Sequence, residues 1–309
     1  MTFTQEGSPA TTPRLSVISF CLNGAPFLRA TIESVLRQTF GEFELVVKDG
    51  GSTDGTLDIL KEYPQIRCLS EKEGGDNPTL DAIWQAFNMS RGDYIIYLAV
   101  SDGLTDRDWF RKCVAVLDSD QEVSWVWGLP QHLSEEGNLG AVVQPEYLRF
   151  APPQKKDFLP LWLASGQMVE SNACFRRQAF QSCFPTNDPA DPYRFHSTLG
   201  FNYNLNTNGY LPWFIPTVSY FGRSHGSQMQ EKHEQLLDSV SKRYSADIIA
   251  YRKNLLSRRI THRFRDGQGR IISEVRPEEL PGIQSRVWNY RLKNKIRRDL
   301  QKLLDHISY

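Results

Sequence analysis

Residues 15–60 of this chain read LSVISFCLNGAPFLRATIESVLRQTFGEFELVVKDGGSTDGTLDIL, and this stretch decides the fold class. Its first part, residues 15–21, is a short and mainly apolar run after a proline, which predicts a buried strand. From Pro26 apolar residues recur at helical spacing up to Leu36, and residues 43–47 form a second strand-like run. The stretch therefore predicts a strand–helix–strand unit, which is the building block of a parallel sheet.

The same alternation continues along the chain. We expect a helix from Leu57 that stops before Pro64, a strand at 66–69, a helix over 80–87 and a strand at 94–100. Strands that alternate with helices predict an α/β fold with a mainly parallel central sheet, flanked by helices. Such sheets bind ligands at the carboxyl ends of their strands. The loops at Asp49 and Asp102 each follow a predicted strand, so both should border one crevice.

Composition and charge narrow the class of protein. Of 309 residues, 40% are hydrophobic and 23% charged, which is usual for a globular protein, and 36 basic residues balance 36 acidic ones, so nucleic-acid binding is not expected. Residues 1–13 lack the apolar core of a signal peptide, and no run is long enough to span a bilayer. We therefore expect a disordered leader and a cytoplasmic protein, whose five scattered cysteines are reduced thiols.

Two loop carboxylates are the first candidates for chemistry. Asp49 begins a glycine-rich segment that a ligand can approach closely, and its carboxylate can accept hydrogen bonds from a nucleobase or ribose; the alternative is a plain turn. Asp102 can hold a divalent cation that bridges a diphosphate, because Mg²⁺ needs few protein ligands when phosphates and water complete its shell. Alternatively, Asp102 or Ser101 caps a helix that begins near Thr105.

Three segments in the right order carry a family resemblance: SVLRQTF at 34–40, DGGSTDGT at 49–56 and GDYIIYL at 92–98. Together they resemble glycosyltransferase family 2, whose members are inverting enzymes of the GT-A fold. The resemblance covers roughly residues 14–226, and it implies a nucleotide-sugar donor and a divalent cation, Mn²⁺ or Mg²⁺. The positions that match donor-binding residues of the family are Phe20, Asn23, Asp49, Asp81, Ser101 and Asp102.

The resemblance also suggests a division of the chain. We expect a GT-A domain at 14–226, with a donor half to about residue 125 and an acceptor half from 126, followed by a helical extension at 227–309. Asp102 and His225 match cation ligands, although a lone histidine is more often structural. Glu170 and Arg176 match a segment that borders the acceptor. We interpret the frequent prolines and aromatic residues after Trp125 as shaping an acceptor pocket.

Several positions depart from the family pattern. Val100 and Gly103 stand where many relatives have acids, and Asn202 matches the position of the general base. Asparagine does not accept a proton usefully near neutral pH. The base therefore comes from elsewhere, the alignment is shifted, or catalysis is weak. The nearby candidates, each of which could instead be an ordinary loop residue, are Asp188, Asp191 and His196.

The implied function is inverting transfer of a sugar from a nucleotide diphosphate to a glycan or lipid-linked acceptor, in cell-surface polysaccharide or glycoconjugate synthesis. One alternative, which Asn202 favours, is a weak or inactive sugar-nucleotide-binding protein on the same fold. A nucleotidyltransferase would be expected to carry a basic, glycine-rich triphosphate loop near its N-terminus. Residues 19–29 contain only Gly24 and Arg29 of the required kinds.

The C-terminal segment from Arg286 suggests a further contact. Its apolar residues advance by three or four, and basic residues occupy most other positions; the apolar series is Trp288, Leu292, Ile296, Leu300 and Leu303. A basic amphipathic helix with a tryptophan can lie on an anionic membrane, here the inner face. Alternatively, the apolar stripe packs on the catalytic domain or on a second subunit of a homo-oligomer.

Overall fold

The computed structural model describes residues 3–6, 12–72, 74–142, 154–166, 172–224 and 234–307. The strands are β1 Phe3–Glu6, β2 Leu15–Cys21, β3 Phe43–Asp49, β4 Arg67–Ser70, β5 Tyr94–Tyr97, β6 Gly103–Leu104, β7 Val123–Leu133, β8 Leu139–Val142, β9 Cys174–Arg176, β10 Leu211–Arg223, β11 Arg263–Arg265 and β12 Ile271–Glu274. The helices are α1 Ala25–Leu36, α2 Thr56–Lys61, α3 Pro78–Met89, α4 Trp109–Ser119, α6 Phe158–Ser165, α7 Arg177–Cys183, α8 Ser197–Thr207, α10 Glu234–Leu256 and α11 Leu280–Ile307, with 3-10 turns η1 Lys155–Asp157 and η2 Pro277–Glu279.

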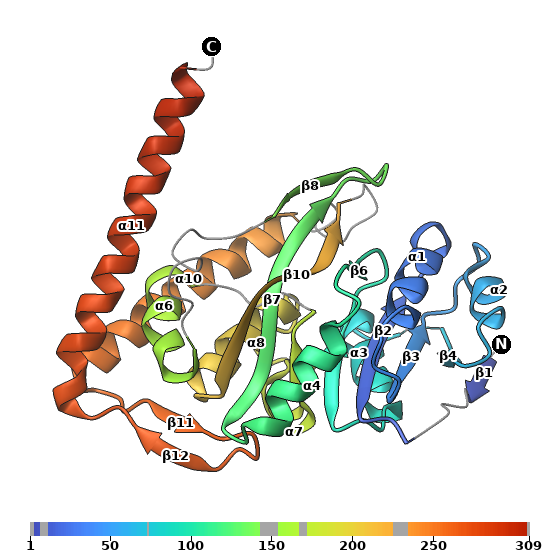
Figure 1. The fold of residues 1–309 in the computed structure, drawn as a ribbon, viewed down its shortest axis with the longest axis horizontal. Helices are drawn as coiled ribbons and strands as arrows, with labels where there is room; N and C mark the ends of the chain where they lie inside the picture. The colour runs from blue at the N-terminus through green and yellow to red at the C-terminus, as the bar shows by residue number, and fades with distance from the viewer. Residues whose placement is uncertain are drawn as a thin grey trace.

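One large sheet runs through the molecule (Figure 1), in the order β1-β4-β3-β2-β5-β9-β7-β10-β6, with β8 paired to β7. Strands β4, β3, β2 and β5 are parallel neighbours, and so are β7 and β10. Strand β9 is antiparallel to both β5 and β7, so it joins the two parallel blocks. The predicted α/β class with a mainly parallel, helix-flanked sheet is confirmed.

The parallel strands are buried on both faces. Successive residues of a strand point to opposite sides. Accordingly, Val17 of β2 packs in a core with residues of α1 and α4, whereas its neighbour Ile18 packs in a second core with residues of α3 and α7. A strand covered on both sides must be apolar on both sides, which explains the continuous apolar run at 15–21.

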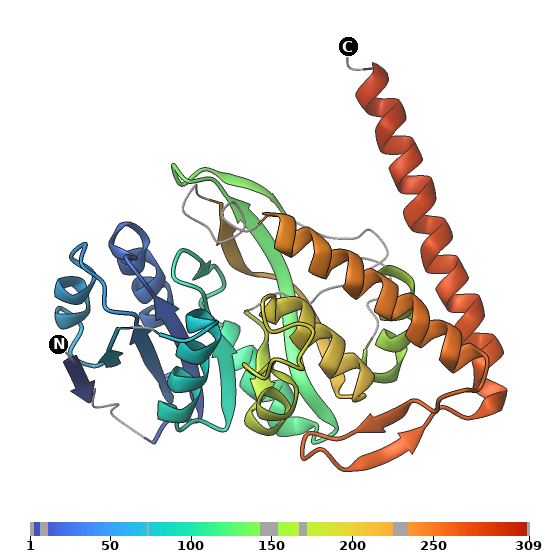
Figure 2. The ribbon, with the colours of Figure 1, turned by 180° about the vertical axis from the view of Figure 1, so that it is seen from behind.

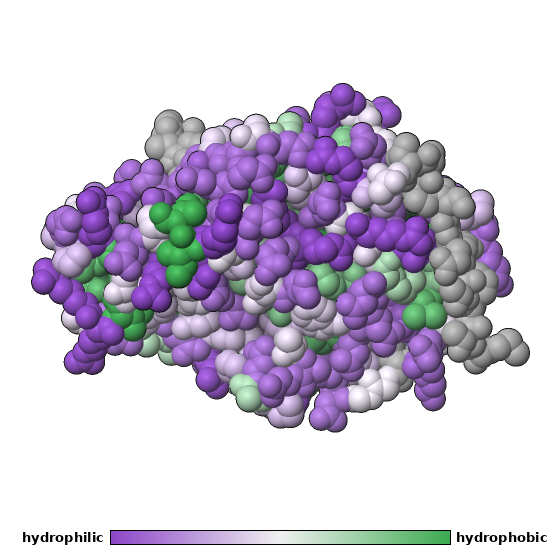
Figure 3. All heavy atoms as spheres, turned by 90° about the horizontal axis from the view of Figure 1, so that it is seen from below, coloured by the Kyte–Doolittle hydropathy of each residue, from purple (hydrophilic) through white to green (hydrophobic). Residues whose placement is uncertain are grey.

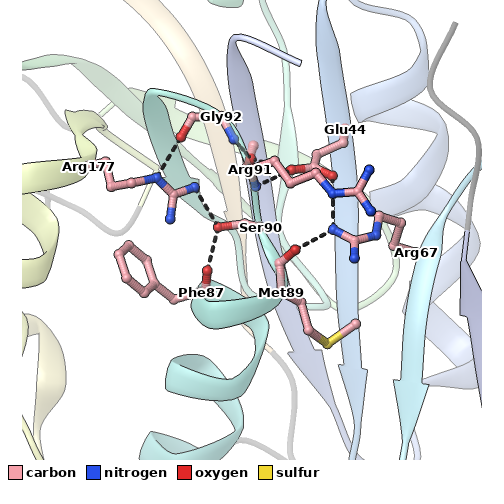
Figure 4. Close-up of polar contacts among 9 residues, drawn as sticks. Glu44, Arg67, Phe87, Met89, Ser90, Arg91, Gly92 and Arg177 are labelled. Atoms are coloured by element: carbon pink, nitrogen blue, oxygen red, sulfur yellow. Dashed lines mark hydrogen bonds and ion pairs between the residues drawn. The ribbon is translucent and has the colours of Figure 1, made fainter. Parts of the chain in front are cut away.

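A buried polar network fastens the loop before β5 to the neighbouring strands (Figure 4). The Glu44 carboxylate, buried on β3, accepts hydrogen bonds from Ser16 Oγ at 2.7 Å and from the backbone N–H of Arg91 at 2.5 Å. It also pairs with Arg67 on β4 at 3.3 Å, and Arg67 donates in addition to the carbonyl of Met89. The network therefore holds β3, β4 and the end of α3 in a fixed relation.

Arg177 of α7 secures the other side of the same loop (Figure 4). Its guanidinium donates to the carbonyl of Gly92 at 2.7 Å and to Ser90 Oγ at 2.9 Å. It also lies over the Phe87 ring, 4.8 Å from the centroid. Burial lowers the pKa of Arg177, but an arginine remains charged near neutrality.

Several aromatic residues of the second half belong to the core. Trp125 and Phe158 meet edge to face with ring centroids 5.5 Å apart, and Phe180 meets Phe201 in the same way at 5.2 Å. All four side chains are buried. The residues that suggested an acceptor pocket, Pro145, Tyr147, Phe150, Pro152 and Pro153, lie outside the described residues. The acceptor pocket therefore stays a prediction.

Part of the expected leader is ordered as a strand. Strand β1 pairs antiparallel with β4, with Thr4 opposite Leu69, which corrects the prediction of disorder for residues 3–6. Without this strand β4 would be an edge strand, whose outward N–H and C=O groups lack partners. Pairing with β1 satisfies them.

The C-terminal extension is helical in α10 and α11, as expected, but it also contains the β11–β12 hairpin. The strands have three and four residues, too short for a visible alternation, although Asp266-Gly267 signals a turn. The hairpin docks at Gly209, whose φ of 74° and contact with the backbone of Arg263 leave no room for a Cβ. Beyond the hairpin, α11 leaves the body of the molecule (Figures 1 and 2).

Candidate functional site

Two loops at the carboxyl ends of β2 and β3 are held together by hydrogen bonds. The backbone N–H of Asn23 donates to Ser52 Oγ at 2.8 Å, and the N–H of Thr53 donates to Asn23 Oδ1 at 2.9 Å. Asn23 has a φ of 54°, a left-handed conformation that asparagine tolerates better than most residues. The N–H of Gly24 donates to Thr56 Oγ1 at 3.0 Å. The structure thus brings the predicted first donor loop and the Asp49 loop together.

Asp49 organises its own loop. Its fully buried carboxylate accepts hydrogen bonds from the N–H groups of Gly51 and Ser52 at 3.0 and 3.1 Å, and from Ser52 Oγ at 2.5 Å. Ser70 Oγ on β4 donates to it as well, at 2.6 Å. These bonds occupy the carboxylate inside the protein. A direct contact between Asp49 and a nucleotide therefore stays a prediction.

Asp54 has a role that the sequence analysis missed. Its carboxylate accepts hydrogen bonds from the N–H of Ala25, at the start of α1, and from both the N–H and the hydroxyl of Thr56, at the start of α2. Desolvation would raise the pKa of Asp54, but these hydrogen bonds outweigh it, so the pKa is lowered. One carboxylate thus accepts hydrogen bonds from the first residues of two helices at this edge of the sheet. The signal in the sequence is that Asp54, an acidic residue, lies three positions before Leu57, the first apolar residue of α2.

Asp102 follows β5 and lies half-buried at the same edge of the sheet. Its Oδ1 accepts a hydrogen bond from the N–H of Arg223, at the end of β10, at 3.1 Å, and its carbonyl accepts one from Thr31 Oγ1. The preceding residue, Ser101, has a φ of 148°, which is unusual for a residue other than glycine. Backbone strain of this kind is concentrated at functional sites.

The side chains around Asp102 suit a cation that is bound jointly by the protein and a diphosphate better than one bound by protein side chains alone. Among the residues that the structure describes, no three His, Cys, Asp or Glu side chains are grouped to hold a metal ion. A single half-buried carboxylate is sufficient only when a diphosphate and water supply the remaining oxygen ligands. His225, the other predicted ligand, lies outside the described residues, beyond the end of β10.

A polar pocket of about 360 Å³ opens beside α3, and Asp81 and Lys48 are among its lining residues. The side-chain amide of Asn187 donates to both carboxylate oxygens of Asp81, at 3.1 and 3.0 Å. Lys48 is buried on β3 and donates to the carbonyls of Asp49 and Glu71 at 2.8 and 2.7 Å. The sequence signal for Lys48 is a lysine that interrupts an apolar strand.

Phe20 stands at the end of β2. Its half-buried ring stacks on that of Tyr97 at the end of β5, with centroids 6.1 Å apart and planes inclined by 13°. The pair forms an apolar wall between the ends of the two strands. Its contact with a donor remains a prediction.

Asn202 does not occupy an open position. It lies within α8 with 1% of its surface exposed, and its Oδ1 and carbonyl both accept hydrogen bonds from the side-chain amide of Asn206. An acceptor hydroxyl cannot reach a side chain buried in this way. The structure therefore differs from the expectation that Asn202 stands at the base position, because α8 turns this residue into the core.

The remaining base candidates lie on a loop that is fastened to α3. The Asn77 side chain donates to the carbonyl of Arg194, and the Asn187–Asp81 contact anchors the same loop. Asp191 is half-buried and accepts the N–H of Tyr193 at 2.9 Å. His196 caps α8, and burial lowers its pKa, which keeps the ring neutral near pH 7. Asp188 is exposed on the same loop and accepts the N–H of Ala190.

Of the two predicted acceptor residues, Arg176 is described, and it lies away from the loops at the carboxyl ends of the strands. Arg176 on β9 pairs with Tyr94, the first residue of β5, and so lies at the opposite edge of the sheet from Asp102. Its buried guanidinium donates to the carbonyls of Val123 and Asp120 at 2.8 and 3.2 Å. This corrects the assignment of Arg176 to an acceptor pocket beside the donor. Glu170 lies outside the described residues.

The fold and the loops at the strand ends define an α/β protein of the GT-A type. The sequence profile described as "Glycosyl transferase family 2" matches residues 16–184, which is more than half of the chain. The chain belongs to this family.

Curated relatives agree with this assignment over part of their length. The chain is 34% identical over 119 residues to a PGL/p-HBAD biosynthesis glycosyltransferase of Mycobacterium bovis (strain BCG / Pasteur 1173P2), and 31% identical over 131 residues to chondroitin synthase of Escherichia coli. These matches cover 38% and 41% of this chain. The chain spans only 46% and 18% of the two relatives.

Solved structures show the same fold at low identity. TarS 1-349 of S. aureus superposes with a TM-score of 0.53 and 14% identity, covering 90% of this chain and 71% of that one. The mannosyltransferase PcManGT from Pyrobaculum calidifontis, solved with GDP-Man and Mn²⁺, gives a TM-score of 0.50 and 19% identity, covering 72% and 60%.

Proposed function

We propose that this protein transfers a sugar, with inversion, from a nucleotide-diphosphate donor to a hydroxyl of a glycan or lipid-linked acceptor, in polysaccharide or glycoconjugate synthesis. One observation carries the proposal: Asp102 follows β5, which runs parallel to β2, so its carboxylate lies at the same edge of the sheet as the cross-linked loops after β2 and β3. This edge of the sheet is where α/β proteins bind their ligands. Family membership supports the same reaction class.

In this proposal the crevice binds the nucleoside and the diphosphate. The rigid loops around Asn23 and Ser52 accept the donor without having to order themselves first, which reduces the entropy cost of binding. Asp49 contributes by holding its loop in shape. TarS has been solved with UDP-GlcNAc, and PcManGT with GDP-Man and Mn²⁺, which supports a nucleotide-sugar donor of this kind.

Asp102, together with His225, would hold a divalent cation on the donor. A bound cation offsets the negative charge that develops on the leaving diphosphate. The hydrogen bond from the backbone N–H of Arg223 restrains the Asp102 carboxylate. The strained backbone at Ser101 places that carboxylate beyond the strand end.

The proton of the attacking hydroxyl needs an acceptor other than Asn202. Asp191 and His196 lie on the loop that is fastened to α3, and α3 borders the pocket beside Asp81. The ring of His196 is neutral near pH 7 because burial lowers its pKa, and it would accept the proton at Nδ1 by releasing the N–H of Leu199. Replacing each residue in turn, as Asp191→Asn and His196→Gln, identifies the acceptor by a loss of turnover without a loss of donor affinity.

Thermal-shift measurements with UDP-, GDP- and dTDP-sugars, with and without Mn²⁺, test the proposal. A ligand that binds only the native state stabilises it, by about 2.7 kcal/mol at a hundred times its Kd. We expect a Mn²⁺-dependent rise in Tm with one nucleotide, lost in Asp102→Asn and kept in Asp93→Asn, a control at the opposite sheet edge. The proposal fails if no nucleotide sugar shifts the Tm, or if Asp102→Asn responds like the wild type.

A second candidate is a protein that binds the sugar nucleotide without transferring it, because the residue that matches the base position in the sequence, Asn202, is a buried asparagine that cannot serve as the base. The two candidates differ in turnover. Release of the nucleoside diphosphate in the presence of a glycan acceptor supports the transferase, whereas donor binding with no release, over a range of acceptors, supports the binding protein.

A further inference from the structure

Helix α11 carries an apolar stripe that no described part of the protein covers. Trp288, Leu292 and Ile296 are 62%, 37% and 50% exposed, and they follow one another at steps of four residues. Such a spacing places them along one side of the helix. By comparison, the face of the molecule seen from below is mainly hydrophilic, with small and separate hydrophobic groups (Figure 3).

The helix packs on the body through its other side. Leu280, Ile283 and Val287 are buried, and α11 contacts α6 at this end. At about 100° per residue, Leu292 is turned roughly 180° from Ile283. The apolar stripe therefore faces away from the body, along a helix that leaves the molecule in both ribbon views (Figures 1 and 2). Packing of the stripe on this chain's own domain, the alternative left open by the sequence, does not occur among the described residues.

Positive charges flank the stripe. Arg291, Lys293 and Lys295 are exposed between its apolar residues, and the sequence continues with Arg297, Arg298 and Lys302. From residue 286 to 304 the only acid is Asp299. Basic side chains beside an apolar stripe can reach lipid phosphates while the apolar side chains enter the interface.

We propose that α11 binds the surface of an anionic membrane, with Trp288, Leu292 and Ile296 in the interfacial layer. No described helix is long and apolar enough to cross a bilayer, so the contact is with the surface. A second copy of the chain is a poorer partner, because pairing two such helices through this stripe brings their Lys and Arg side chains together. Like charges in close contact cost free energy, whereas anionic headgroups neutralise them. The inference is independent of the proposed sugar transfer.

Vesicle sedimentation with the full chain tests the inference. The protein should pellet with vesicles of mixed phosphatidylcholine and phosphatidylglycerol at low salt, but not with pure phosphatidylcholine, and high salt should release it. Replacing the three apolar residues, as Trp288→Ala, Leu292→Ala and Ile296→Ala, should lower the partition coefficient by roughly a hundred-fold. The matched control changes exposed apolar residues of β12, as Ile271→Ala and Ile272→Ala, and should pellet like the wild type.

A second readout reports the contact directly. Trp288→Phe should remove the blue shift of tryptophan emission that vesicles induce, with the circular dichroism spectrum unchanged because the side chain is exposed. The inference is overturned if the wild type does not pellet with anionic vesicles, or if the α11 variant pellets equally well. It is also overturned if sedimentation velocity shows a dimer that the α11 substitutions dissociate while vesicle binding is absent.

Discussion

Replacing Asp49 by alanine should destabilise the folded protein even when no ligand is present, because the loop after β3 loses the carboxylate that holds it. The buried carboxylate accepts hydrogen bonds from the N–H groups of Gly51 and Ser52 and from the hydroxyls of Ser52 and Ser70, and a weaker one from the thiol of Cys21. A hydrogen bond to a charged group contributes about 1.5–3 kcal/mol, and a buried donor left without an acceptor costs about 1–3 kcal/mol. The loop groups can turn to water, but Ser70 is buried. We therefore expect a loss of about 3 kcal/mol in the free energy of unfolding.

At about 2 °C per kcal/mol for a chain of this size, the Tm of Asp49→Ala should fall by about 6 °C, measured by calorimetry without ligand. The control is Asp58→Ala on the adjacent helix, whose carboxylate is exposed and pairs only with Lys61 at the surface among the contacts described. That change should shift stability by no more than about 0.5 kcal/mol. The reasoning is refuted if Asp49→Ala keeps the wild-type Tm while its affinity for a nucleotide diphosphate falls, because the carboxylate would then be a ligand contact and not a loop organiser.

Three further outcomes follow from buried groups. Glu44→Gln removes the charge that Arg67 faces in the buried network (Figure 4) and should cost about 3 kcal/mol by urea unfolding; an unchanged midpoint would show that the pair contributes nothing. Burial lowers the pKa of His262 to about 4, below its ordinary value of 6.5. Between these two pH values the unfolded state binds more protons than the folded state. The free energy of unfolding should therefore fall by about 3 kcal/mol as the pH drops from 6.5 to 4. His262→Gln should lack this component and His132→Gln, an exposed control, should keep it; equal pH profiles for all three proteins would contradict the assignment. Asn202→Asp places a carboxylate in the core and should cost about 2 kcal/mol or more with no gain in turnover, so a more active variant would show that this position reaches the acceptor.

The position of much of the site could be predicted because the end of a strand is marked by residues that are neighbours in the sequence. The runs 15–21 and 43–47 are apolar on both faces, so a parallel sheet followed from them, and the loops at Asn23, Asp49 and Asp102 had to emerge at one edge. What each side chain does there was less accessible. Asp49 is a ligand candidate by position, but its hydrogen bonds come partly from Ser70, a residue on another strand.

Errors arose where a distant segment decides the environment. Arg176 was assigned to the acceptor side, but β9 runs antiparallel to β5 and carries it to the opposite edge. Asn202 matched a base position, yet the rotation of α8 directs it into the core. The β11–β12 hairpin was missed because its strands are too short to show a period, and its docking depends on Gly209, more than fifty positions before it in the chain.

The sequence by itself determined the α/β class, the family and the edge of the sheet at which ligands are expected, because alternation and turn residues act over a few neighbouring positions. It also specified an amphipathic α11, since its spacing is a property of one helix. Only the tertiary structure decided that the carboxylate of Asp49 is used internally, that Arg176 and Asn202 lie away from the crevice, and that Trp288 and Leu292 face outward. Those outcomes depend on which elements pack together, and contacts between residues far apart in the chain leave no periodic trace in it.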